Sequence, residues 1–245
     1  MKKLFLLSFV LWQSTAWSAD LTVSAAASLT QAFQDIGAHF ESQNSGTKVK
    51  LNFGASGALM QQIANGAPVD VFASADTDTM DKAVAKGVVV VADVKVFTTN
   101  KLVLIVPIQS KITLQQLADL KKPDIKRIAM GTPASVPAGH YALGSLEKAG
   151  IWNEVKDKVI NTTNVRQALD YVSRDEVDAG FVYASDAQLM QDKVKVAMQV
   201  TTVTPIQYPI AQVVGSANKN LSFKFIQFLQ SPLAQTTLRK YGFGE

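Results

Sequence analysis

The chain of 245 residues contains no cysteine and only two histidines. The absence of cysteine excludes disulfides, thiolate zinc sites, iron–sulfur clusters and cysteine nucleophiles. Two histidines cannot form a three-histidine zinc site, and the sequence has no HExxH motif. His39 lies beside Phe40 in a segment with helical spacing, where a structural role is the simpler interpretation. Metal and thiol chemistry therefore have little support.

Motifs of nucleotide binding and hydrolysis are also missing. The sequence has no GxxxxGK[ST] phosphate loop, no GxGxxG fingerprint and no EF-hand pattern. Gly54-Ala-Ser-Gly-Ala58 approaches the GxSxG nucleophile elbow, but the elbow requires glycine where this chain has Ala58. An exported hydrolase with Ser56 as nucleophile and His140 as base stays open as an alternative, without a motif to support it.

Charge is sparse and balanced in this sequence. Charged residues make up 18% of the chain, and 24 Lys and Arg residues stand against 20 Asp and Glu residues. The sequence has no run of basic residues and no stripe that mixes basic with aromatic side chains. We therefore expect no nucleic acid partner.

The N-terminus has the pattern of a secretory signal peptide. Met1-Lys-Lys3 is positively charged, residues 4–12 are apolar, and polar and small residues follow. About nine strongly apolar residues are too few to cross a hydrocarbon core of about 30 Å, which argues against a membrane anchor. Ala16-Trp-Ser18 fits the small-x-small cleavage rule. We expect residues 1–18 to be removed and the mature protein to reach the periplasm of a bacterial envelope.

Apolar, strand-like runs alternate with segments of helical spacing along the rest of the chain. Such alternation is typical of βαβ units, so we expect an α/β fold with mixed, mostly parallel sheets flanked by helices. The expected strands cover residues 21–27, 49–53, 69–73, 101–107, 127–130, 180–183 and 208–214, and the expected helices cover residues 29–41, 57–64, 77–86, 114–120, 139–149, 165–174 and 221–229.

One internal similarity suggests that the chain forms two lobes. Val69-Asp-Val-Phe-Ala-Ser-Ala-Asp76 resembles Val177-Asp-Ala-Gly-Phe-Val-Tyr-Ala-Ser-Asp186, although chance similarity of common residues is an alternative. If the two segments are equivalent strands, the chain crosses between the lobes near residues 100 and 205. The expected lobes are then residues 19–100 with 206–245, and residues 101–205.

Small or hydroxyl residues stand repeatedly where an expected strand is followed by a helix. Ser28, Ser56 and Asn164 are in N-cap positions, and Pro137 opens another helix. The first turn of a helix has backbone N–H groups without partners and a partial positive charge, which together bind small anions. Each residue alone is first of all a structural cap. Because ligands of open α/β sheets bind beyond the carboxyl ends of the strands, the combination points to an anion site.

Other residues near these helix starts fit the same interpretation. Gly54, Gly57 and Gly139 would permit close approach of the backbone. Tyr183 ends an expected strand, where its hydroxyl is either a donor to a ligand or part of the core. These patterns indicate a cleft that holds an anion, but they do not identify which anion.

Seven segments in order, spread over nearly the whole mature chain, resemble the periplasmic molybdate-binding proteins. They are Ala25-Ala-Ala-Ser-Leu-Thr30, Phe53-Gly-Ala-Ser56, Gly66-Ala-Pro-Val-Asp-Val-Phe-Ala-Ser-Ala-Asp76, Val136-Pro-Ala-Gly139, Asn164-Val-Arg-Gln-Ala-Leu169, Gly180-Phe-Val-Tyr183 and Lys240-Tyr-Gly-Phe243. The resemblance implies a two-lobed periplasmic binding fold of type II, which closes on its ligand by a hinge.

The resemblance also implies the ligand and its contacts. Ser28 and Ser56 would bind molybdate or tungstate through hydroxyl and backbone donors, Ala138 and Val165 through backbone N–H groups, and Tyr183 through its hydroxyl. These residues would contact the oxygens of the oxyanion rather than a bare metal cation. No catalytic residue and no cofactor is implied. A carrier of sulfate or another tetrahedral oxyanion is the alternative.

Delivery to an ABC importer is implied as well, with an inner-membrane permease and its cytoplasmic ATPase as partners of a monomer. The sequence departs from the family pattern at three positions. Gly57 and Ala58 stand where relatives have serines, and His140 stands where members can have an apolar residue. We expect these departures to change affinity or the preference between molybdate and tungstate, and to leave the class of ligand unchanged.

Overall fold

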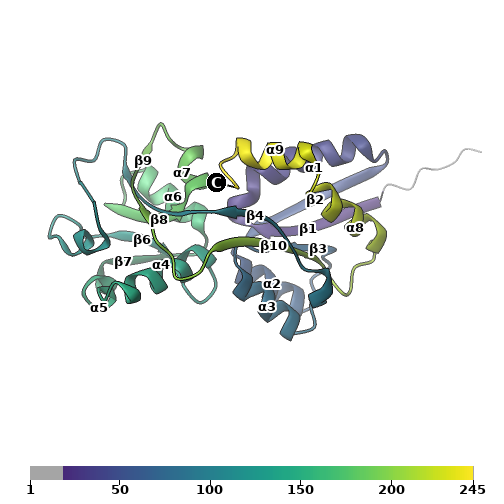
Figure 1. The fold of residues 1–245 in the computed structure, drawn as a ribbon, viewed down its shortest axis with the longest axis horizontal. Helices are drawn as coiled ribbons and strands as arrows, with labels where there is room; N and C mark the ends of the chain where they lie inside the picture. Colours follow the sequence, from purple (N-terminus) through teal and green to yellow (C-terminus); the bar gives the residue numbers. More distant parts are fainter. Residues whose placement is uncertain (1–18, 245) are drawn as a thin grey trace, which may run out of the picture.

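The computed structural model describes residues 19–244, in two lobes that lie end to end (Figure 1). The predicted signal peptide, residues 1–18, lies outside this range. Each lobe is built on a five-stranded sheet. The sheet of lobe 1 has the order β2-β1-β3-β10-β4, with β1 at Ala19–Ala26, β2 at Thr47–Gly54, β3 at Val71–Ala73, β4 at Lys95–Asn100 and β10 at Ile206–Gln212. The sheet of lobe 2 has the order β7-β6-β8-β5-β9, with β5 at Leu102–Pro107, β6 at Ile128–Gly131, β7 at Val159–Thr162, β8 at Ala179–Tyr183 and β9 at Val194–Val200.

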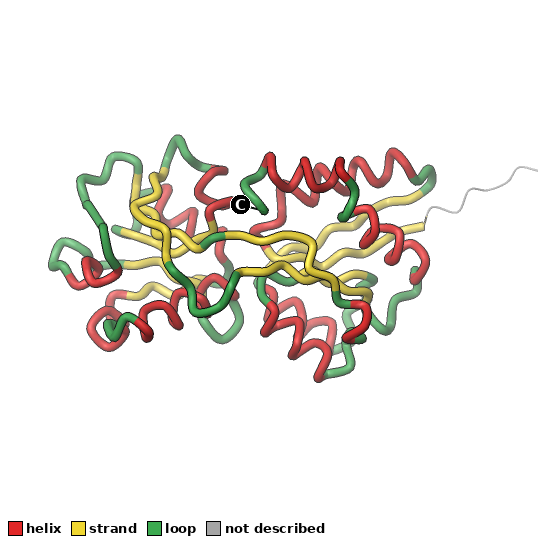
Figure 2. Tube along the Cα trace, viewed as in Figure 1, coloured by secondary structure: helices red, strands yellow, loops and turns green. Residues whose placement is uncertain are grey.

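Helices cover both faces of each sheet (Figure 2). Those of lobe 1 are α1 at Thr30–Gln43, α2 at Ser56–Ala64, α3 at Thr77–Ala85, α8 at Lys219–Phe228 and α9 at Pro232–Lys240. Those of lobe 2 are α4 at Pro137–Lys148, α5 at Trp152–Val155, α6 at Val165–Ser173 and α7 at Ala184–Leu189. Short 3-10 turns lie at Ala27–Leu29, Val91–Asp93, Leu117–Lys121 and Lys156–Lys158. Within residues 19–244, none of these helices has the length and apolar character needed to cross a membrane.

The two sheets share one topology. In lobe 1, β1 pairs in parallel with β2 and β3, and β10 pairs antiparallel with β3 and β4. In lobe 2, β6 pairs in parallel with β7 and β8, and β5 pairs antiparallel with β8 and β9. Both sheets are mixed as expected, and the antiparallel pairings come from the strands that cross between the lobes.

The topology confirms that the two similar segments form equivalent strands. β3 and β8, which lie within residues 69–76 and 177–186, occupy the third position in their sheets. The chain leaves the first sheet between Asn100 and Leu102, and it returns between Val200 and Ile206. The precise division of the chain into residues 19–100 with 206–245, and residues 101–205, stays a proposal.

Most expected elements are present with ends shifted by a few residues, but the helix expected at residues 114–120 is not. A 3-10 turn, Leu117–Lys121, replaces it, and only Leu120 of that turn is buried. The Asp119 carboxylate accepts the backbone N–H groups of Gln115 and Gln116, which favours a tight turn over a continuous helix. Strands β4, β7 and β9 and helices α5, α7 and α9 are elements that the sequence patterns did not predict.

Apolar packing in the centre of the molecule holds the two crossings in place. All six residues of β5 are buried, as their continuous apolar run predicts. The Tyr208 ring on β10 packs edge-on against Phe97 and Phe243, and its centroid lies 5.7 Å from that of Tyr183. Aromatic pairs in such arrangements add to the free energy of burial. The rings therefore tie the end of β8 in lobe 2 to β10 in lobe 1.

Close packing between helix α4 and strand β6 depends on a glycine. A Cβ atom at Gly139 would overlap the backbone carbonyl group of Gly131. The Gly131 atoms that the Cβ would meet all belong to the backbone, so no side-chain rotation can relieve the overlap. This contact fixes the start of α4 directly on the end of β6.

We expect Gly139→Ala to lower the free energy of unfolding by about 1–3 kcal/mol or more, because the added methyl forces α4 away from β6. Urea denaturation of the two proteins measures the difference. Gly144→Ala is the matched control in the same helix, since its Cβ would meet only Val203 at an ordinary 3.5 Å. Equal denaturation midpoints for the two variants would contradict the prediction.

Candidate functional site

All five predicted site residues line one small cavity between the lobes. Ser28 and Ser56 come from lobe 1, and Ala138, Val165 and Tyr183 come from lobe 2. The volume of this cavity is about 10 Å³. That is about the room that one water needs, so in this arrangement the cavity excludes a sugar or a peptide.

Ser28 lies within the 3-10 turn that precedes α1, and its expected role as an N-cap is wrong. Ala26 is the cap of the turn and Leu29 that of α1, so Ser28 is an inner residue of the turn and makes no cap hydrogen bond. Its Oγ atom instead lies 3.0 Å from the hydroxyl oxygen of Tyr208. If Tyr208 is the donor in this pair, the proton of Ser28 is free to point into the cavity.

Ser56 is likewise the first residue of α2 rather than its cap, which is Ala55. Its Oγ atom accepts the backbone N–H of Ala75 at 3.0 Å. Ser56 is fully buried, and a hydroxyl that accepts one hydrogen bond still has its own proton to donate. The bond to Ala75 therefore positions a donor at the wall of the cavity.

Tyr183 brings a phenol to the same cavity from the end of β8. Its hydroxyl donates to the carbonyl oxygen of Ala75 at 3.4 Å, which is a long hydrogen bond. Burial raises the pKa of the Tyr183 phenol well above its ordinary value. The group is therefore a neutral donor throughout the physiological range of pH.

Two helix starts face the cavity from lobe 2. Ala138 is the second residue of α4, and Val165 is the first residue of α6. First-turn N–H groups have no acceptor within their own helix. The cap of α6 is Asn164, as expected, and its side chain accepts the N–H of Gln167 at 3.1 Å. The backbone N–H groups of Ala138 and Val165 thus remain available at the cavity.

Three hydrogen bonds cross between the lobes around this cavity. The Gly57 N–H donates to the Ser135 carbonyl at 3.0 Å, and Arg166 Nη2 donates to the Ser28 carbonyl at 2.9 Å. The third is the bond from Tyr183 to Ala75. No sequence pattern predicted a role for Ser135, Arg166 or Ala75, although Arg166 and Ala75 lie within segments that carry the family resemblance.

Arg166 is a charged side chain close to the cavity, and it pairs with a buried carboxylate. Arg166 Nε lies 2.8 Å from Asp186 Oδ1, although the angle is too poor for a hydrogen bond. Asp186 is fully buried, and its Oδ2 accepts the N–H of Tyr183 at 3.2 Å. Burial raises the pKa of the Asp186 carboxyl, and the charge of Arg166 opposes this shift. No charged side chain is among the residues that line the small cavity.

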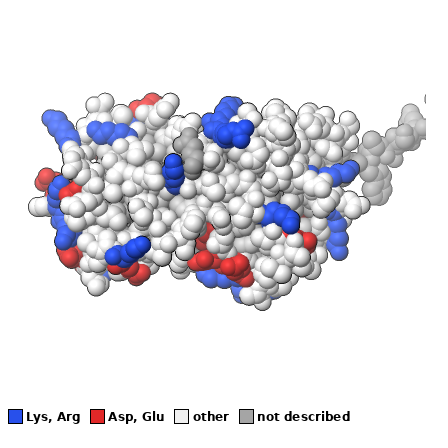
Figure 3. Space-filling model, viewed as in Figure 1, with Lys and Arg blue, Asp and Glu red and all other residues white. Residues whose placement is uncertain are grey.

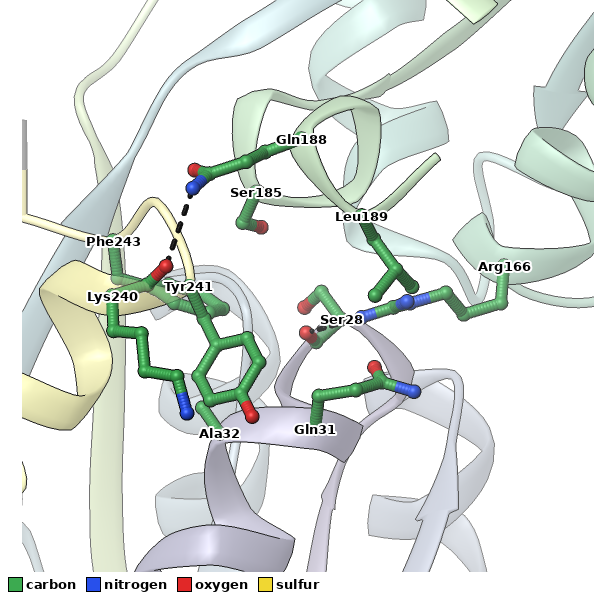
Figure 4. A pocket seen from close by; sticks show the side chains of 10 residues that line it. All are labelled: Ser28, Gln31, Ala32, Arg166, Ser185, Gln188, Leu189, Lys240, Tyr241 and Phe243. Carbon is green, nitrogen blue, oxygen red and sulfur yellow. Dashed lines mark hydrogen bonds between the residues drawn. The ribbon is translucent and has the colours of Figure 1, made fainter. Parts of the chain in front are cut away.

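A second cavity of about 210 Å³ lies beyond Ser28, and it does contain charged side chains. Figure 4 shows the Arg166 side chain reaching towards Ser28, with Lys240 and Tyr241 of lobe 1 on the opposite side. Gln188 donates to the Lys240 carbonyl at 3.2 Å and links the lobes there. Over the visible face of the molecule, side chains of both signs are dispersed (Figure 3).

His140 is not part of the small cavity. Its Nε2 atom lies 3.1 Å from Asp78 Oδ2, and both side chains are about half exposed. Asp78 belongs to α3 and His140 to α4, so the pair joins the lobes at the rim of the cleft. His140 is absent from the residues that surround Ser56 in the cavity, so the alternative of a hydrolase with this serine and this histidine has no geometric support.

Known proteins resemble this chain over almost its whole length. A putative ABC transporter substrate-binding lipoprotein of Bacillus subtilis, YvgL, is 38% identical over 91% of this chain and 85% of its own length. The molybdate-binding protein ModA of Haemophilus influenzae is 36% identical over 94% of this chain and 92% of its own.

A solved structure also resembles this chain over most of its length. The substrate-binding domain of a putative molybdenum ABC transporter from Clostridium difficile superposes with a TM-score of 0.70 at 36% identity, over 93% of this chain and 99% of that one. Residues 21–244 match the family described as bacterial extracellular solute-binding proteins. This protein therefore belongs to the bacterial extracellular solute-binding proteins and is a transport protein rather than an enzyme.

Proposed function

We propose that this protein captures molybdate or tungstate in the small cavity between its lobes and delivers the oxyanion to an ABC importer. The observation that carries the proposal is the convergence of neutral donors from both lobes on one small cavity with no charged side chain in its wall. The 36% identity to a molybdate-binding protein supports the choice of anion.

The proposed contacts follow the chemistry of a dianion with four oxygen acceptors. The hydroxyls of Ser28 and Ser56 and the N–H groups of Ala138 and Val165 would donate to those oxygens. The Tyr183 hydroxyl would give up its long bond to the Ala75 carbonyl and donate to the ligand instead. Hydrogen bonds to an ionised acceptor are shorter and stronger than neutral ones. Such bonds stabilise a buried dianion without a cationic side chain, and the positive ends of helices α4 and α6 add to the effect.

A set of contacts made of donors also discriminates between anions. Monoprotonated phosphate has an O–H that meets only donors among the proposed contacts, and an unpaired buried donor costs roughly 1–3 kcal/mol. Sulfate is a dianion like molybdate but is smaller, so only the size of the closed cavity can reject it. A carrier of sulfate or another tetrahedral oxyanion is therefore the alternative function.

Closure of the lobes would couple ligand binding to delivery. In an open arrangement Ser28 and Ser56 separate from Ala138, Val165 and Tyr183, so neither lobe alone supplies the full set of donors. A ligand that contacts both lobes shifts the population towards the closed state. The importer would then recognise the closed form.

The location and the partners follow from the same proposal. A signal peptide cleaved after Ser18 would deliver the mature chain to the periplasm as a monomer. Its partners would be an inner-membrane permease and the cytoplasmic ATPase of that permease. The name of the Bacillus relative, an ABC transporter substrate-binding lipoprotein, supports an importer as the partner.

Thermal denaturation with single anions tests the ligand. We expect molybdate and tungstate to raise the melting temperature strongly, because a ligand at about a thousandfold excess over its Kd adds about 4 kcal/mol to the stability of the folded state. Sulfate and phosphate at the same concentration should have little effect. A shift with sulfate alone would favour the alternative carrier, and no shift with any of the four anions would refute the proposal.

Removal of one proposed donor tests the site. We expect Ser56→Ala to weaken molybdate binding by about 10- to 150-fold, since a hydrogen bond to a charged group contributes about 1.5–3 kcal/mol. Isothermal titration calorimetry measures the change. Ser24→Ala is the control, because Ser24 is a buried serine of lobe 1 that bonds Asn52 and does not line the cavity. Equal losses in the two variants would mean that the effect is structural.

A further inference from the structure

One backbone hydrogen bond joins the two segments that supply donors from opposite lobes. The Gly57 N–H donates to the Ser135 carbonyl oxygen at 3.0 Å. Gly57 directly follows Ser56 in α2, and Ser135 lies two residues before the start of α4 at Pro137. The bond therefore sets the distance between the Ser56 side of the cavity and the Ala138 side.

Only glycine at position 57 permits this distance. A Cβ atom there would lie 2.9 Å from the carbonyl oxygen of Ser135 and 3.0 Å from its Cα atom. Both are backbone atoms, so no rotation of a side chain relieves the contact. An added methyl would have to push the two segments apart by several tenths of an ångström.

Nothing within lobe 1 requires glycine at this position. Gly57 is not among the glycines with positive φ, and it lies in the first turn of a helix, where alanine is favourable. The atoms nearest to its missing Cβ all belong to Ser135 of lobe 2. The need for glycine therefore arises only when the lobes are closed.

We propose that Gly57 is a positioning residue that determines how tightly the lobes close on the oxyanion, and through this its affinity and its size selectivity. This inference rests on the proposed function. A side chain at position 57 would act as a wedge that keeps the lobes apart beside the cavity. The bond between Arg166 and Ser28 and the contact between His140 and Asp78 would still hold the lobes together elsewhere.

The wedge would act on the closed state alone. In the open state the added methyl meets no atom of lobe 2, so the unliganded protein is unaffected. The free energy of closure rises, and the apparent affinity falls because the competent state is less populated. A smaller anion spans a widened cavity less well, so sulfate should lose more affinity than molybdate.

Calorimetric titration of Gly57→Ala with molybdate and with sulfate tests the inference. We expect molybdate affinity to fall about tenfold or more. The melting temperature without ligand should equal or exceed that of the unmodified protein, because alanine favours the helix. Gly37→Ala in α1 is the matched control, since its Cβ would meet Val49 and Leu51 side chains at 3.6–3.7 Å, and its affinity should be unchanged.

Small-angle scattering provides a readout that a merely local defect would not change. With saturating molybdate, Gly57→Ala should keep a larger radius of gyration than the unmodified protein. Equal affinity and equal radius in the two proteins would overturn the inference while leaving the proposed function intact. A lower melting temperature of unliganded Gly57→Ala would also overturn it, by showing that lobe 1 itself needs the glycine. If the unmodified protein binds none of the oxyanions, the proposed function is wrong and the inference fails with it.

Discussion

The exclusion of charge from the small cavity is the constraint on which the interface between the lobes depends. A buried cation in the wall would require a partner of its own, and the pair would compete with any anion for the same space. Arg166 shows how the fold avoids this. Its side chain pairs with the fully buried Asp186, neither residue lines the cavity, and the guanidinium reaches lobe 1 through the carbonyl group of Ser28. The cation thus strengthens the closed arrangement while the wall itself stays neutral.

The repeated topology explains why neutral donors from both lobes meet at one point. In each sheet the third strand, β3 or β8, ends near the interface, and helices start there from both sides. Because the carboxyl ends of strands and the N-termini of helices share an edge of the sheet, facing lobes present two sets of unpaired N–H groups to each other. Tyr208 and Asn100 hold the crossings at this edge, since Asn100 donates to both Ser185 and Tyr208.

The sequence predicted what depends on local pattern. The apolar run of β5, the helix start at Asn164 and the equivalence of β3 and β8 follow from periodicity, capping chemistry and repetition. The positions of β4 and β9 do not follow from such patterns, because each strand has an exposed valine, Val96 or Val196, that obscures the alternation. The five site residues came from the family resemblance, whereas the rule for helix caps alone did not choose among the helix starts.

The errors at Ser28 and Ser56 have one physical cause. A serine before a helix satisfies a backbone N–H locally, and sequence patterns detect that possibility. In the folded chain these hydroxyls bond Tyr208 and Ala75, which lie 180 and 19 residues away. The bond from Arg166 to Ser28 spans 138 residues. The first two contacts are set by the packing within lobe 1 and the third by the packing of the two lobes against each other, and no local pattern predicts any of them.

Two glycines show how the same close approach has different consequences within a lobe and between lobes. Gly139 packs on Gly131 inside lobe 2, so the contact is present whenever that lobe is folded. Gly57 packs on Ser135 across the cleft, so its contact is present only in the closed form. The first contact contributes to the free energy of folding and the second to the free energy of closure. A glycine whose nearest neighbours belong to the other lobe is therefore under a functional constraint rather than a folding constraint, and the identity of those neighbours distinguishes the two cases.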